Sequence, residues 1–256
     1  MKKYFLVAMM LLLGWTCEGQ TTESQLSVRI PTIQQEASSI WRTIHDIAFF
    51  EQQNYTINLP DAPLIHQLIA KSKAGTFGNE DFSPIYQLLE DGAYQKEDYM
   101  SAYEKVVARQ NLLLDAIQQL DSMRSCCLDW DFYMPPKYEV VLTLYGSGGS
   151  YDPESGIITL FMTKEGAFKR YLDPASTLVH EMVHIGLEKT IVEKYQLPHQ
   201  EKERLVDLFV SLMFGDVLPQ YKVQDFGTLA LDSLIKDQEA LLNLGTTMEV
   251  YVKQKK

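Results

Sequence analysis

Cysteine is scarce in this sequence, and basic residues are outnumbered by acidic ones. Only three cysteines occur among 256 residues, without a CxxC motif, so neither a cysteine zinc site nor a disulfide scaffold is present. Cys126 and Cys127 are adjacent, which allows either a strained mutual disulfide or a pair of thiols. The net charge is −11 and no basic stripe occurs, which excludes a nucleic-acid partner.

The N-terminus lacks an apolar run long enough to span a bilayer, but residues 1–19 are typical of an export signal. Lys2 and Lys3 form a positive region, and Phe5 to Leu13 form a short apolar one. Cys17 stands where a bacterial lipoprotein signal places its lipidated cysteine, and cleavage after Gly19 is the competing interpretation. We expect an exported protein: periplasmic, membrane-anchored only through such a lipid, or secreted.

Helical periodicity dominates the chain after this signal. Apolar residues recur at helical spacing in four stretches: residues 31–51, 63–72, 83–90 and 97–120. Residues 20–134 are therefore expected to form an N-terminal helical segment. The β-rich stretches 138–145 and 157–162 flank a glycine-rich loop and predict an antiparallel pair. This loop has neither a P-loop lysine nor a dinucleotide-binding fingerprint, so it does not indicate a phosphate site.

The next helix is expected to be buried. Asp173 is a good N-cap, Pro174 suits the first helical position, and the pattern continues to about Tyr195. Apolar residues occur on nearly every side of it, which is typical of a helix inside a core. The sequence therefore predicts an α+β fold. It is mostly helical, with a small antiparallel β segment just before this helix, and residues 135–256 form the second region.

Two of only five histidines lie within this helix, in His180-Glu181-Met182-Val183-His184. Histidines four residues apart project from one face of a helix, so both imidazoles can bind one metal ion. Glu181 is rotated by one residue and points toward the open position of such a metal. Leu187 and Thr190 occupy the positions where the metzincin pattern requires glycine and histidine, so that class is excluded.

A catalytic zinc ion needs a third protein ligand, and the sequence offers two candidates. Glu203 lies on the following helix in Glu203-Arg204-Leu205-Val206-Asp207. Asp207 shares its helix face and can accept a hydrogen bond from a liganding imidazole. His199 directly follows Pro198 at an expected helix start and is the rival ligand. We prefer Glu203 and keep His199 as the alternative.

At this point the chain resembles the gluzincin metallopeptidases, in particular the thermolysin-like clan. The resemblance covers residues 178–209 and rests on HEMVH followed by ERLVD at nearly the family separation. It implies a zincin-like fold with these roles: His180, His184 and Glu203 as Zn²⁺ ligands, Glu181 as general base, and Asp207 as the partner of a liganding histidine. Tyr195 falls where these enzymes carry a tyrosine that stabilises the oxyanion. The family's downstream catalytic histidine is missing, because no histidine follows His199.

The expected activity is peptide-bond hydrolysis by a zinc-bound water that Glu181 activates. Peptidases of this type bind extended substrate against an exposed strand, and residues 157–162 are the candidate, although an ordinary hairpin would have the same sequence pattern. The alternatives are a zinc hydrolase of another amide or ester and a non-catalytic envelope protein that binds metal. The retained Glu181 argues against the last, because a structural zinc site has no use for a base.

Overall fold

The computed structural model describes residues 25–126, 128–168, 173–224 and 229–255. The expected export signal, with Cys17, lies outside these residues, as do the side chains of Cys126 and Cys127. The strands are β1 (Leu26–Arg29), β2 (Tyr138–Thr143), β3 (Gly149–Asp152) and β4 (Ile157–Phe161). The α-helices are α1 (Ile33–His45), α2 (Ile47–Gln52), α3 (Pro63–Lys73), α4 (Phe82–Leu88), α5 (Met100–Val107), α6 (Gln110–Cys126), α7 (Pro174–Leu187), α8 (His199–Phe214), α9 (Leu229–Leu234), α10 (Gln238–Leu242) and α11 (Leu244–Gln254). The fold is α+β and mostly helical, as the sequence predicts.

The four strands form one mixed sheet in the order β1-β2-β4-β3. The predicted antiparallel pairing of the two β-rich stretches is wrong, because β2 and β4 run parallel, with Val140 opposite Ile158. The intervening glycine-rich segment is itself a strand, β3, and it pairs antiparallel with β4. The chain therefore reverses twice between β2 and β4, the second time at Gly156, which has a φ of 73°. The edge strands are β1 and β3, and β4, the candidate for an exposed substrate-binding strand, lies inside the sheet.

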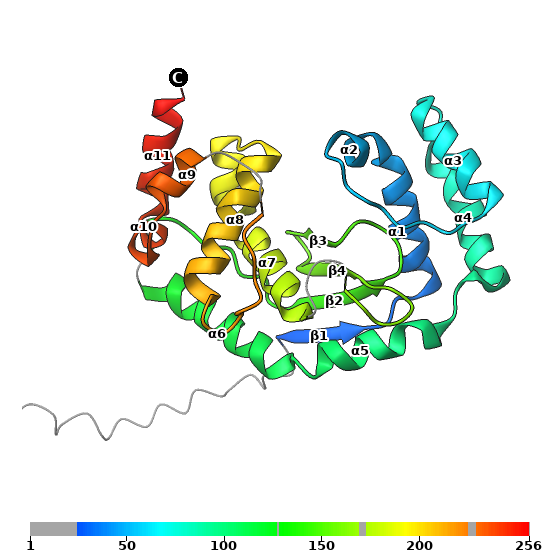
Figure 1. Cartoon of the computed structure of the whole chain (residues 1–256), viewed down its shortest axis with the longest axis horizontal. Helices are drawn as coiled ribbons and strands as arrows, with labels where there is room; N and C mark the ends of the chain where they lie inside the picture. Colours follow the sequence, from blue (N-terminus) through cyan, green and yellow to red (C-terminus); the bar gives the residue numbers. More distant parts are fainter. Residues whose placement is uncertain (1–24, 127, 169–172, 225–228, 256) are drawn as a thin grey trace, which may run out of the picture.

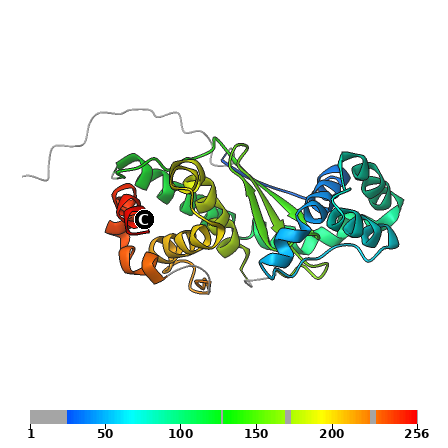
Figure 2. The same ribbon diagram turned by 90° about the horizontal axis from the view of Figure 1, so that it is seen from above.

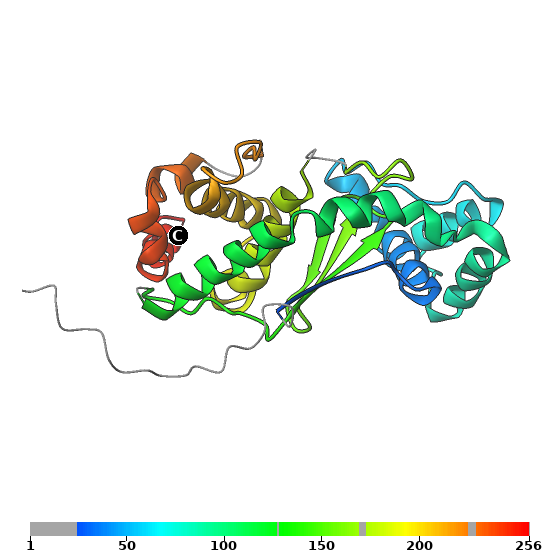
Figure 3. The same cartoon turned by 90° about the horizontal axis from the view of Figure 1, so that it is seen from below.

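The sheet also includes a strand from the start of the described chain. β1 pairs parallel with β2, with Leu26 opposite Tyr138, so the expected N-terminal helical segment contributes to the sheet of the following region. The β1 edge is covered by α5 (Figure 3). The β3 edge has no neighbouring strand among the described residues. An edge of this kind presents main-chain N–H and C=O groups that are not paired with another strand.

Two of the predicted helices are interrupted. The helix expected over residues 31–51 begins well, because Thr32 and Gln35 form a capping box, but it breaks at Asp46 into α1 and α2. The helix expected over residues 97–120 is divided at Ala108 and Arg109 into α5 and α6. Apolar periodicity predicts most of the buried face of these segments, although Ala48 and Val107 are exposed, and it is insensitive to a one-turn change of direction.

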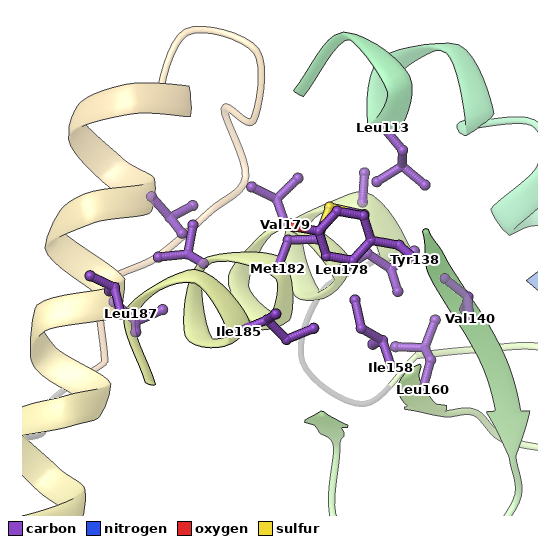
Figure 4. Close-up of a cluster of buried hydrophobic side chains, with 14 of the residues drawn as sticks. Leu113, Tyr138, Val140, Ile158, Leu160, Leu178, Val179, Met182, Ile185 and Leu187 are labelled. Carbon is purple, nitrogen blue, oxygen red and sulfur yellow. The ribbon is translucent and has the colours of Figure 1, made fainter. Parts of the chain in front are cut away.

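Helix α7 lies at the centre of the molecule. Asp173 caps it through a 3.0 Å hydrogen bond from the Ala175 amide, and Pro174 occupies its first turn, as predicted. Leu178, Met182 and Ile185 lie with Tyr138, Ile158 and Leu160 of β2 and β4 in one buried cluster (Figure 4). Every residue from Leu178 to Leu187 is buried. The polar residues of α7 therefore need partners inside the protein.

The helices lie on the two faces of the sheet (Figure 2). Helices α1 to α4 lie on one side, and α6, α7 and α8 lie on the other. Helix α8 packs against α7, while α9, α10 and α11 complete the second side (Figure 1). In the same view α2 and α8 stand on either side of β3. Among the described residues, none of the helices has both the length and the apolarity needed to cross a bilayer.

Candidate metal centre

Helix α7 brings His180 and His184 together, as their spacing predicts. Their Nε2 atoms are 3.0 Å apart, and the two ring planes are 75° from parallel. Both residues are buried, with exposed fractions of 6% and 2%. Two imidazole nitrogens this close inside a core either share a proton or face a common cation.

Glu203 of α8 completes a group of three donors. Its Oε2 lies 3.4 Å from His180 Nε2, and its Oε1 lies 3.3 Å from His184 Nε2. Ligand atoms bound at about 2.0–2.1 Å in a tetrahedral zinc site are roughly 3.3 Å apart, so the spacing fits such an ion. These three buried residues could therefore hold a metal ion, with two nitrogen donors and one oxygen donor.

Tyr221 and Asp207 hold His180 in place from behind. The Tyr221 hydroxyl donates to Asp207 Oδ1 at 2.5 Å and lies 2.7 Å from His180 Nδ1. Because its one proton goes to Asp207, Tyr221 accepts from the Nδ1–H of His180, which leaves Nε2 as the ring nitrogen that faces Glu203. Asp207 itself is 3.4 Å from His180 Nδ1, and its Oδ2 also accepts a hydrogen bond from the main-chain N–H of Gln224. The sequence predicts the Asp207 contact, but the pattern contains no signal for Tyr221.

His199, the rival ligand, lies beside the group and not within it. Its Nδ1 is 3.7 Å from Glu203 Oε1, and its Nε2 is 2.9 Å from the Tyr55 hydroxyl. Burial lowers the pKa of His199, which favours a neutral ring. Among the described residues, the group that could bind a metal contains Glu203 and does not contain His199.

Glu181 lies next to the main chain of the edge strand. A Cβ added to Gly149 would be 2.1 Å from Glu181 Oε1, so only glycine leaves room for this carboxylate. Glu181, His180 and His184 all line one cleft of about 1010 Å³. The carboxylate therefore stands beside the three donors at a surface that a ligand can reach.

Tyr151 of β3 covers the outer side of His184. The two rings stack with centroids 4.8 Å apart and planes within 10° of parallel. The Tyr151 hydroxyl donates to Glu188 and accepts from Lys202 Nζ at 2.9 Å. His184 Nδ1 is buried and has no hydrogen-bond partner among the described residues. The orientation of His184 thus depends on ring packing, whereas His180 is oriented by hydrogen bonds.

The electrostatic field of the group favours a cation. Burial lowers the pKa of His180, but its hydrogen bonds to the carboxylates of Asp207 and Glu203 outweigh burial and raise this pKa to about 10. Burial lowers the pKa of His184 to about 4, which keeps that ring neutral. Burial raises the pKa of Glu203, but the two histidines bring it well below its ordinary range. The ionised Glu203 and the neutral His184 are in the protonation states that metal binding requires, whereas His180 would release a proton when a metal ion binds.

Tyr195 is not brought to the three donors. Its hydroxyl donates to the main-chain carbonyl of Gly245 on α11 at 3.1 Å. It lies beyond the end of α7, where a π-helical turn (Glu188–Glu193) continues the helix, and it does not line the cleft. Tyr195 is close to the site in the sequence, but its side chain points toward α11 in the structure.

Comparisons with protein-family models, with curated proteins and with solved structures find no match for this chain.

Proposed function

We propose that this protein is a zinc-dependent metallohydrolase, and specifically a peptidase, with His180, His184 and Glu203 as the zinc ligands. The observation that carries the proposal is the combination of three buried donors 3.0–3.4 Å apart with a carboxylate beside them in an accessible cleft. A structural zinc site is normally closed by four protein ligands, whereas a catalytic site has three and an open position. Two nitrogens and one carboxylate oxygen are donors that suit zinc.

Zinc, when bound, supplies a Lewis acid that lowers the pKa of water to about 7 and polarises a carbonyl group. In this proposal Glu181 takes a proton from the attacking water and passes it to the leaving amine. Tyr221, itself held by Asp207, accepts from Nδ1–H of His180, so that Nε2 stays directed at the ligand group and would bind zinc after it releases its proton.

An extended peptide fits the cleft through the free edge of β3. The Phe161 amide donates to the Gly148 carbonyl at 2.8 Å, so hydrogen-bonded pairs alternate along β3 from that point. The main-chain N–H and C=O groups of Gly149 and Tyr151 therefore point away from β4 toward the open edge. Strand addition to this edge would place a substrate backbone beside Glu181. In this proposal the strand that binds the substrate is β3 and not β4.

The base role of Glu181 is tested by Glu181→Gln, which keeps the shape of the side chain and removes the proton acceptor. We expect zinc content to stay at the wild-type level and hydrolysis of peptides to fall by about 10²–10⁴-fold. Zinc is measured by elemental analysis of the purified protein, and cleavage by a chelator-sensitive assay with a peptide library. Unchanged proteolysis in the variant would refute this mechanism. A parent protein that binds zinc and cleaves no substrate would favour the non-catalytic alternative.

The identity of the third ligand is tested with a matched pair of variants. Glu203→Ala is expected to lose zinc, because only two donors remain. His199→Ala is expected to stay metallated, since His199 Nδ1 lies outside the donor group. Both proteins are compared by zinc content after dialysis against a weak chelator. Metal loss in His199→Ala with retention in Glu203→Ala would reassign the ligand.

A further inference from the structure

Four aromatic rings gather in the cleft at its boundary with the N-terminal helices. Phe49 and Phe50 come from α2, Tyr55 from the loop after it, and His199 from the start of α8. The Phe49 ring is 5.2 Å from that of His199 and 6.3 Å from that of Tyr55. Phe50 contacts both Phe49 and Tyr55 edge-on, at 5.7 Å and 6.1 Å. We call these four residues the aromatic cluster.

The aromatic cluster connects the two sides of the cleft next to the metal centre. Helix α2 stands on one side of β3 and α8 on the other (Figure 1). Tyr55 and His199 bridge them through the 2.9 Å contact between the tyrosine hydroxyl and Nε2. His199 Nδ1 in turn lies 3.7 Å from Glu203 Oε1. The aromatic cluster therefore adjoins the three donors through His199 and lines the same cleft.

The contact surface that this part of the cleft offers is apolar. Phe49 is 40% exposed, although most large apolar residues of the described chain are buried. Two charged residues of this part of the cleft contact other side chains: Arg42 donates to Ser150 at 2.7 Å, and Asp46 contacts His45 Nδ1 at 2.7 Å. An exposed phenylalanine that lines a cleft is typical of a ligand-binding surface.

We infer that the aromatic cluster binds an aromatic or large aliphatic side chain of an extended peptide, next to the bond that is cleaved. This inference rests on the proposed peptidase function and assigns part of its specificity to α2 and the following loop. A strand added to the free edge of β3 directs alternate side chains to opposite sides. Phe49 and Tyr55 line the same cleft as Gly149 and Tyr151 of β3. Edge-on and stacked ring contacts then favour an aromatic side chain over a small one.

The inference is tested by equilibrium binding to the zinc-loaded Glu181→Gln protein, which does not consume the peptide. Two fluorescently labelled eight-residue peptides of alanine and serine are compared, one of which carries a single central phenylalanine. We expect the phenylalanine peptide to bind about tenfold more tightly in fluorescence anisotropy, a difference of about 1.4 kcal/mol. Adding Phe49→Ala should reduce this ratio to about twofold without changing the affinity of the alanine-serine peptide.

Three control variants separate the ring contacts from other effects. Val250→Ala removes a 41% exposed apolar residue on α11, outside the cleft, and should leave the tenfold ratio unchanged. Tyr55→Phe removes the hydrogen bond to His199, keeps the ring, and should also preserve the ratio. If Phe49→Ala is shown by circular dichroism to be unfolded, Tyr55→Ala takes its place, with the same expected loss of selectivity.

The outcomes for this inference and for the peptidase proposal are distinct. Equal binding of both peptides, or a tenfold ratio that survives Phe49→Ala, would overturn the inference. Cleavage of both peptides with equal efficiency by the wild-type protein would also overturn the inference about the aromatic cluster. It would still support the peptidase proposal. Phenylalanine-dependent binding without any cleavage by wild type would support the aromatic cluster as a peptide-binding site and refute the peptidase proposal.

Discussion

At the scale of single residues, the site depends on side chains whose partners come from distant parts of the sequence. His180 is oriented by Tyr221, which follows it by 41 positions and bridges it to Asp207. Helical spacing indicates which residues share a face of α7 or α8. It carries no information about a tyrosine in the irregular segment after α8. Tyr221 is therefore the residue that the sequence analysis missed.

The Tyr221 bridge predicts a metal-affinity effect. Tyr221→Phe keeps the ring and removes the hydroxyl, so His180 Nδ1 loses its 2.7 Å acceptor. We expect zinc affinity to fall by about 10–100-fold, which competition with a chromophoric chelator measures. Tyr195→Phe is the matched control, because its hydroxyl contacts Gly245 and should not influence zinc. Equal zinc affinity of Tyr221→Phe and wild type would show that Asp207 orients His180 without the bridge.

A second residue with an unusual environment is Glu36 on α1, which is fully buried. Its Oε1 accepts from the Tyr99 hydroxyl and the Leu144 amide, and its Oε2 accepts from the Thr143 hydroxyl. Burial raises the pKa of Glu36 from the ordinary value of 4.5, and the three hydrogen bonds only partly oppose this. Glu36 connects α1 to the end of β2 through these hydrogen bonds. Its contribution to the free energy of unfolding depends on pH, because its pKa differs from the ordinary value.

The raised pKa of Glu36 predicts how stability changes with pH. Above pH 4.5 the unfolded chain loses this proton while the folded protein keeps it, so the contribution of Glu36 to stability falls as pH rises toward the folded pKa. Glu36→Gln does not titrate, and its amide can donate to Thr143. We expect the variant to gain stability relative to wild type between pH 4.5 and neutral pH in urea unfolding. Parallel pH profiles would contradict the raised pKa.

At the scale of elements, α7 approaches its neighbours closely because it contains a glycine. A Cβ on Gly186 would lie 2.0 Å from Cζ of Phe132, a buried ring that stacks on Phe209 of α8. The Gly186 carbonyl also accepts from the Tyr133 amide. This contact holds the segment before β2 against the helix that carries both histidines.

Gly186→Ala therefore predicts a loss of stability. The added methyl group must displace the Phe132 ring in a packed core, which costs about 1–3 kcal/mol or more. Gly148→Ala is a suitable control, because a Cβ there meets no atom within 4 Å and should be nearly neutral. Urea denaturation of both variants measures the difference. Equal midpoints for the two would show that α7 has room to shift.

At the scale of the whole molecule, the candidate metal centre joins two helices that meet only through tertiary packing. His180 and His184 belong to α7, and Glu203 belongs to α8. A metal ion held by both would bind the folded protein and not the unfolded chain, so it would stabilise the fold. The cleft above it combines β3, α7, α8 and the N-terminal helices in one surface.

Removal of metal predicts a lower melting temperature. Zinc at 100 times its dissociation constant contributes about 2.7 kcal/mol, which corresponds to roughly 5–10 °C for a chain of this size. We expect a chelator to lower the melting temperature by this amount and added zinc to restore it, as followed by calorimetry. His184→Ala should show no response to either reagent. A wild-type melting temperature that is indifferent to both would contradict the metal centre.

The sequence by itself determined the α+β character, the capped and buried helix α7, and the convergence of His180 and His184, because these follow from local periodicity and helix geometry. The contact of Glu203 with both histidines was predicted from helix spacing and a family resemblance, and packing of α8 on α7 realises it. Only the tertiary structure decided that β2 and β4 run parallel, that β3 lies at an edge of the sheet, and that Tyr221 and not Tyr195 reaches the site. Strand pairing and side-chain contacts between distant segments depend on how the chain reverses in space. The spacing of apolar residues does not indicate whether two strands run parallel or antiparallel.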